Sequence, residues 1–212
     1  PAVGLLLGIY CGGMYGGSIS AILILVPAIL FFFLEFSDQP LRQRILLSLF
    51  QSVTTRTAGF NTADLTAMSQ SGQLLMIILM IIGGSSGSTA GGMKITTFAV
   101  VTLSLIASMR KQDHANVFSR RLPEDTVRSA YALSLMYVAL FVGGGMIISL
   151  IEKAPLLTCL FETASAIGTV GLTLGITPVL HLSSRMILIL FMFFGRVGGL
   201  TFAYAAAGRR DM

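Results

Sequence analysis

The sequence carries a short polar segment inside apolar sequence, and it does so twice. The first segment reads SVTTRTAGFN over residues 52–61, and the second reads SAIGTVGLT over residues 165–173. Such a segment leaves peptide groups without helical partners, which hydrocarbon tolerates only where the backbone is buried in protein or lines water. The pattern therefore favours a pore lined by backbone carbonyls. The alternative is a turn between packed helices that contacts no ion.

The amino-acid composition excludes a soluble fold. Apolar residues make up 54% of the 212 residues, charged residues make up only 11%, and the mean hydropathy is +0.85. We expect an all-α integral membrane protein, because a helix of about 20 apolar residues crosses roughly 30 Å of hydrocarbon. Apolar stretches of suitable length lie at about 19–36, at 73–82 continuing brokenly to 109, at 128–151 and at 182–207.

The positions of the basic residues predict an orientation in the membrane rather than nucleic-acid binding. The net charge is +5, and basic side chains crowd the linker 111–127, its flanks and the C-terminus. By the positive-inside rule, the linker and the C-terminus are cytoplasmic in a multi-pass protein of a bacterial-type plasma membrane. The two histidines, His114 and His181, lie apart from cysteine or carboxylate clusters at ligand spacing, so we expect no metal site of side chains. The sequence also has no scaffold for Ser-His-Asp chemistry, and we expect neither a cofactor nor enzymatic activity.

The two halves of the sequence are related by an offset of 112 residues. The offset places Thr57 on Thr169, Gly59 on Gly171, Met80 on Met192, Gly83 on Gly195 and Gly87 on Gly199. Each half then consists of an outer helix, a short apolar segment, a polar hairpin and a second long helix. The predicted division is a partial glycine-rich segment 1–18, a first repeat 19–110, the linker 111–127 and a second repeat 128–212.

The short apolar segments, 41–55 and 155–167, are too brief to span the bilayer, so we expect two re-entrant pore helices that enter from the outside. A polar turn follows each short helix. Gly59 in the first turn and Gly171 in the second can adopt a positive φ or approach a neighbour closely. That conformation would aim the preceding carbonyls at a common axis, where they could replace water around a monovalent cation. These carbonyls belong to Thr57, Ala58, Thr169 and Val170.

Four segments resemble the Trk/Ktr/HKT superfamily of potassium transporters, in particular the membrane subunit of the bacterial Ktr type. They are FQSVTTRTAGFNT (50–62), IIGGSSGSTAGGMKITTF (81–98), FETASAIGTVGLTLGIT (161–177) and FMFFGRVGGLTF (191–202). The resemblance implies a single pore built from four helix–pore loop–helix repeats, of which this chain is similar to the third and fourth. It further implies potassium uptake, often coupled to sodium, by a homodimer in membrane lipid that binds a cytoplasmic ring of nucleotide-binding regulatory subunits.

The resemblance also implies roles for individual residues. The two filter loops correspond to Arg56, Thr57, Ala58 and Gly59, and to Gly168, Thr169, Val170 and Gly171. The glycine-rich run resembles the family's intramembrane gating loop, and the gate residues are Gly83, Gly84, Ser85, Gly87, Ser88, Thr89, Gly91, Gly92, Lys94 and Arg196. Composition independently predicts a helix break in this run, because each glycine costs a helix roughly 1 kcal/mol relative to alanine.

Three charged residues have alternative interpretations. Arg196 is costly at membrane depth and should face the pore or a partner, either as the family's barrier to cation flow or in a salt bridge with Glu162. Lys94 is a gate residue or a lysine whose long stem reaches the cytoplasmic interface. Arg56 could brace the pore helix by donating to free carbonyls, or could pair with a carboxylate from a repeat that this chain lacks.

Residues 8–26 follow a different pattern. They resemble the glycine-rich YGGS-x-S-A-I-L signature of the large membrane subunit of tripartite tricarboxylate transporters. Three hypotheses therefore stand: half of a potassium pore that needs a complementary half or a second copy, a fragment of a carboxylate transporter, and an inert truncated remnant.

Overall fold

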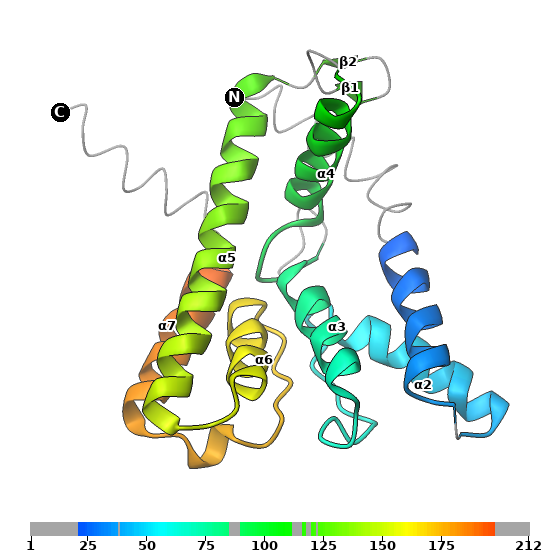
Figure 1. Cartoon of the computed structure of the whole chain (residues 1–212), viewed down its shortest axis with the longest axis vertical. Helices are drawn as coiled ribbons and strands as arrows, with labels where there is room; N and C mark the ends of the chain where they lie inside the picture. The colour runs from blue at the N-terminus through cyan, green and yellow to red at the C-terminus, as the bar shows by residue number, and fades with distance from the viewer. Residues whose placement is uncertain are drawn as a thin grey trace.

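The structure is a computed structural model that describes residues 21–37, 39–84, 90–111, 116–117, 120–121 and 123–197. It is helical, as the sequence predicts, apart from a pair of two-residue antiparallel strands in the linker (Figure 1). The first helix is described over Ala21–Leu34. The remaining elements are α2 (Leu41–Thr54), α3 (Gln70–Ile81), α4 (Ile95–Met109), β1 (Asn116–Val117), β2 (Arg120–Arg121), α5 (Glu124–Glu152), α6 (Leu156–Ile167), the 3₁₀ turn η1 (Thr177–Val179) and α7 (Leu182–Val197).

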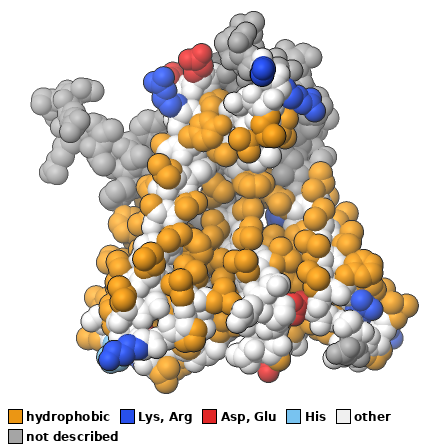
Figure 2. Space-filling view, viewed as in Figure 1, with side chains coloured by type: hydrophobic (Ala, Val, Ile, Leu, Met, Phe, Trp, Pro, Cys, Tyr) orange, Lys and Arg blue, Asp and Glu red, His pale blue; other side chains and the backbone are white. Residues whose placement is uncertain are grey.

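The helix α5 meets the requirements for a membrane span. It has 29 residues, with a mean hydropathy of 2.1 in its most apolar part, and leucines on it such as Leu135 and Leu150 are 72% and 78% exposed. Figure 2 shows apolar side chains over the middle of one face of the molecule and most charged side chains near its two ends. Apolar side chains exposed over so much of one face are suited to contact with lipid or another protein.

The predicted break in the glycine-rich run is present, because α3 ends at Ile81 and α4 begins at Ile95. The backbone on the two sides of the break pairs with itself. Met93 N donates to Ile81 O at 3.1 Å, and Gly83 N donates to Met93 O at 2.7 Å. A Cβ at Gly83 would collide with the carbonyl oxygen of Gly91, so this pairing requires glycine there. Polar backbone between the two half-helices is thus partly satisfied within the break itself.

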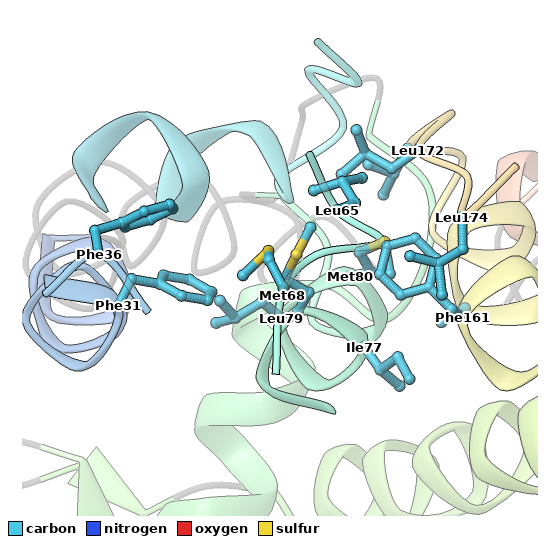
Figure 3. Packing of buried hydrophobic residues seen from close by; sticks show 13 residues of the cluster. Phe31, Phe36, Leu65, Met68, Ile77, Leu79, Met80, Phe161, Leu172 and Leu174 are labelled. Atoms are coloured by element: carbon cyan, nitrogen blue, oxygen red, sulfur yellow. The ribbon is translucent and has the colours of Figure 1, made fainter. Parts of the chain in front are cut away.

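The helix α6 lies at the centre of the fold and packs against α3, α5 and α7 (Figure 1). Its C-terminal half is buried without interruption from Phe161 to Ile167. Phe161 belongs to a cluster that joins both halves of the chain, with Met80 and Leu79 of α3, Phe31 of the first helix, and Leu172 and Leu174 beyond α6 (Figure 3). The two halves of the chain therefore pack together in this cluster.

The helix α2 has the reverse of the polarity expected in water. Its buried residues are Ser48, Gln51, Ser52 and Thr54, whereas its exposed ones include Leu41, Ile45, Leu49 and Val53. The buried groups have partners inside the protein: Ser52 Oγ donates to Ile24 O at 2.7 Å, and Gln51 Nε2 donates to Met76 Sδ at 3.0 Å. Such a helix is stable where its outer face meets lipid or another apolar surface.

A glutamate at the end of each outer helix fixes the start of the following inner helix. Glu35 accepts a hydrogen bond from Ser69 N at 3.0 Å, directly before α3. Glu152 accepts one from His181 N at 2.8 Å, directly before α7. Ser69 and His181 are related by the same offset of 112 residues. The offset of 112 residues therefore also relates the residues that precede α3 and α7, whereas the two glutamates that bind them, Glu35 and Glu152, are 117 residues apart.

Candidate functional site

The two polar turns have matching backbone conformations. Thr57 and Gly59 have φ of 62° and 71°, and their counterparts Thr169 and Gly171 have φ of 51° and 92°. A positive φ at the two glycines agrees with the sequence analysis, whereas the same conformation at the two threonines was not predicted. For a β-branched residue it is a strained state that persists only when its surroundings impose it.

The end of each short helix holds its turn in this conformation. Ala58 N and Gly59 N both donate to Thr54 O at 3.2 Å. In the second turn, Val170 N donates to Ser165 O at 2.9 Å, and Gly171 N donates to the Ser165 hydroxyl at 3.2 Å. The amide groups of both turns are therefore bound to the helix that precedes them.

The carbonyl groups of the two turns differ from the amide groups in their hydrogen bonding. Among the described residues, no hydrogen bond reaches the carbonyl oxygens of Thr57, Ala58, Thr169 and Val170. Ala58 is exposed, Thr57 and Thr169 are half-buried and Val170 is buried, so these carbonyls range from open to enclosed. Four unpaired acceptors on two related turns can coordinate a cation that has lost its water.

The two turns lie against each other. A Cβ added at Gly59 would collide with the carbonyl oxygen of Val170. The same Cβ would lie 3.8 Å from the Cα of Gly171. Gly168 is equally close to the carbonyl of Met80, at the end of α3. The absence of a side chain at these glycines allows the backbones of the two repeats to approach so closely.

Glu162 supports the segment that leaves the second turn. Its carboxylate accepts from Thr173 Oγ1 at 2.6 Å, from Leu174 N at 3.0 Å and from Thr177 Oγ1 at 2.7 Å. The salt bridge with Arg196 that the sequence left open is therefore replaced by hydrogen bonds. Sequence reasoning missed this role, although two threonines four residues apart, close after the turn, were its signal.

The glycine-rich break contacts the second turn. Gly91 N donates to Thr169 Oγ1 at 3.0 Å, and Gly92, with φ of 73°, lies beside Gly168 and the Ile81 carbonyl. Of the predicted gate residues, Gly83, Gly84, Gly91 and Gly92 are thus near the site or its supporting backbone. The other four in the run, Ser85, Gly87, Ser88 and Thr89, lie outside the described residues.

Positive charge gathers beside this break. Lys94 Nζ donates to Ala90 O at 2.5 Å, and the positive charges of Lys94 and Arg196 are close enough to repel each other. Arg196 lies in the last turn of α7. Arg56 differs from Lys94 in its hydrogen bonding, because the Nε of Arg56 is buried and donates to none of the described residues. The bracing contact to pore-helix carbonyls that the sequence suggested for Arg56 is not present among them.

An all-α membrane protein with two turns of matching backbone conformation is the class of protein that this fold and site define. A model of the TrkH family, described as cation transport protein, matches residues 19–210. The chain belongs to this family, as the resemblance predicted. The family is one of transporters rather than enzymes. Because the match covers both repeats, the interpretation as a fragment of a carboxylate transporter is not favoured.

Individual relatives agree with the family assignment. The chain is 41% identical over 164 residues to the Ktr system potassium uptake protein B of Bacillus subtilis (strain 168), which covers 77% of this chain and 37% of the relative. It is 38% identical over 192 residues to the protein of the same name from Vibrio alginolyticus, over 88% of this chain and 42% of the relative. The chain therefore spans about two fifths of the length of these relatives.

The fold also resembles a solved structure. The crystal structure of the potassium transporter TrkH from Vibrio parahaemolyticus superposes with a TM-score of 0.75 and 21% identity, over 94% of this chain and 48% of that chain. At this identity the likeness concerns the fold. It agrees with the all-α membrane architecture.

Proposed function

We propose that this chain forms half of a potassium uptake pore and contributes two of the four filter loops. The observation that carries the proposal is the pair of matching turns, whose amides are bound to their own helices and whose carbonyls are unpaired among the described residues. The names of the Ktr relatives support potassium as the transported ion. Sodium is the second candidate ion, either coupled to transport or competing for the same carbonyls.

The filter would work by replacing water around the ion. Carbonyls of Thr57, Ala58, Thr169 and Val170 supply two sides of a ring, and the complementary loops come from the first two repeats of a larger subunit or from a second copy. Because the turns are held by hydrogen bonds and by the contact of Gly59 with Val170, they need little reorganisation when an ion arrives. Such preorganisation favours an ion that fits the fixed carbonyls.

The gate in this proposal is the broken helix beneath the second turn. The segment 90–94 lies against Thr169 and Gly168, and it brings Lys94 close to Arg196. Two positive charges at membrane depth oppose the passage of a cation. Movement of the segment would move Lys94 away and lower that barrier.

The same proposal includes the partners of the complete transporter. A homodimer in the plasma membrane, with the linker and C-terminus in the cytoplasm, would place the broken helix near a cytoplasmic ring of nucleotide-binding regulatory subunits. The exposed apolar face of α2 supports an arrangement in which further helices or lipid cover this chain.

Potassium uptake by a transport-deficient bacterial strain tests the proposal. The chain is expressed alone and together with the first two repeats of a Ktr-type subunit. Uptake is expected with the complementary half, and uptake by the chain alone would mean that two copies close the ring. Gly59→Asp and Gly171→Asp should abolish uptake, because each places a carboxylate and a strained residue in the turn. Inserted protein without uptake in either arrangement would favour the inert remnant.

A further inference from the structure

Two equivalent threonines in the site have different hydrogen-bond partners. Thr57 and Thr169 occupy the same place in the repeat and share a positive φ. Thr57 Oγ1 donates to the neighbouring carbonyl of Arg56, at 2.6 Å. Thr169 Oγ1 instead accepts from Gly91 N, 78 residues away, at 3.0 Å. One hydroxyl is thus used locally, while the other joins the second turn to the broken helix.

The surroundings of Gly91 make this contact specific. Any Cβ at Gly91 would collide with the side chain of Thr169. Gly92 adopts a φ of 73°, and a Cβ there would be 3.4 Å from the Cα of Gly168. The segment therefore approaches the turn through two consecutive glycines, and a backbone-to-hydroxyl hydrogen bond joins Gly91 to Thr169 there.

The contact also connects to charge. The ammonium group of Lys94 donates to the carbonyl of Ala90 at 2.5 Å, which connects the two ends of the segment 90–94. Anything that displaces Gly91 therefore displaces Lys94, whose charge lies near that of Arg196. On the other side of the bond, the backbone of Thr169 carries one of the unpaired carbonyls.

We propose that the Thr169 hydroxyl is a positioning group that couples the ion-facing backbone of the second turn to the segment 90–94, so that the occupancy of the turn by a cation changes how firmly the segment is held. The coupling part rests on the proposed function. The anchoring part does not, because it concerns a hydrogen bond within the chain. Thr57, whose hydroxyl is used locally, has no such role.

Hydrogen exchange of the purified full chain in lipid nanodiscs tests the anchor. In Thr169→Val the exchange of residues 90–94 should become roughly three- to tenfold faster, because one hydrogen bond holding the segment is lost. Thr169→Ser retains the hydroxyl and should restore the slow exchange. Thr57→Val, which makes the same chemical change in the equivalent turn, should leave the exchange of 90–94 unchanged.

The α5 peptides report on the fold in the same experiment. Wild-type exchange at 90–94 in Thr169→Val would overturn the proposal. So would faster exchange extending to α5 in both Thr169→Val and Thr169→Ala, because the side chain would then support the fold as a whole rather than the segment.

The coupling is tested on the chain reconstituted together with the complementary half, which supplies the other two filter loops, by comparing potassium with choline in the buffer. Potassium should slow exchange at 90–94 in the wild type and in Thr169→Ser, but should not do so in Thr169→Val. A potassium effect that persists in Thr169→Val would overturn the coupling. If potassium has no effect on the wild type although the same two halves support potassium uptake, the coupling is overturned. If uptake is absent as well, the proposed function has failed, and faster exchange in Thr169→Val then still supports the anchor.

Discussion

At the scale of single residues, the site depends on backbone conformations that side chains oppose. Thr57 and Thr169 have a positive φ despite their branched side chains, and holding such a residue there costs about 1–3 kcal/mol. Hydrogen bonds from the turn amides to the preceding helices compensate for this cost. The strained conformation leaves the carbonyls without partners, which links the strain to the proposed ion site.

Gly59 is the residue whose replacement should be most damaging. In Gly59→Ala the new methyl group meets the Val170 carbonyl at a positive φ of 71°, so we expect a loss of at least about 2 kcal/mol of stability and no potassium uptake with the complementary half. Gly175→Ala is the matched control, because φ is 91° there but nothing lies within 4 Å of the added Cβ. It should lose only about 1–2 kcal/mol from backbone strain. Equal losses in denaturation in mixed detergent micelles would contradict the collision.

At the scale of elements, α6 organises the molecule through its neighbours. Its buried C-terminal half contacts both repeats, and α7 approaches it so closely that a Cβ at Gly195 would collide with the carbonyl of Ile167. On its other side, Gly145 of α5 lies against Leu160. Small residues at helix contacts are typical of membrane proteins, where close packing rather than the hydrophobic effect holds helices together.

Adjacent glycines in α5 should respond to alanine with opposite signs. A Cβ at Gly143 meets nothing within 4 Å, whereas a Cβ at Gly144 would collide with the ring of Phe191 in α7. We expect Gly143→Ala to gain up to about 1 kcal/mol of stability from helix propensity. Gly144→Ala should lose about 1–3 kcal/mol through overpacking. Denaturation of both variants measures the difference, and a loss in Gly143→Ala similar to that in Gly144→Ala would disprove the packing of α5 on α7.

At the scale of the whole molecule, several features point to surfaces that the described residues leave uncovered. The apolar residues Leu41, Ile45, Leu49 and Val53 lie along one side of α2 and are exposed. Arg56, directly after that helix, has a buried Nε without an acceptor among the described residues. In the proposed pore, two turns provide only part of a ring of carbonyls. Each of these is expected of a chain that matches about two fifths of its relatives.

Arg56 should therefore matter more to the assembled transporter than to this chain. In the chain alone, Arg56→Met removes an unpaired buried donor, so stability should be unchanged or higher by up to about 1 kcal/mol. With the complementary half, the same substitution should weaken association by about 1–3 kcal/mol, because a carboxylate or carbonyl of that half loses its donor. Co-purification of the two halves measures this effect. Equal recovery with arginine and with methionine would refute the predicted partnership.

The sequence alone determined the membrane class and the place of the helix break, and it predicted the duplication. These follow from local properties, because hydropathy, glycine content and the register of Gly59 with Gly171 act along the chain itself. Only the tertiary structure decided that Glu162 binds Thr173 and Thr177 rather than Arg196, and that Thr169 rather than Thr57 contacts Gly91. Equivalent residues in a repeat have the same local preferences but different neighbours, and hydrogen bonds between distant segments depend on the neighbours.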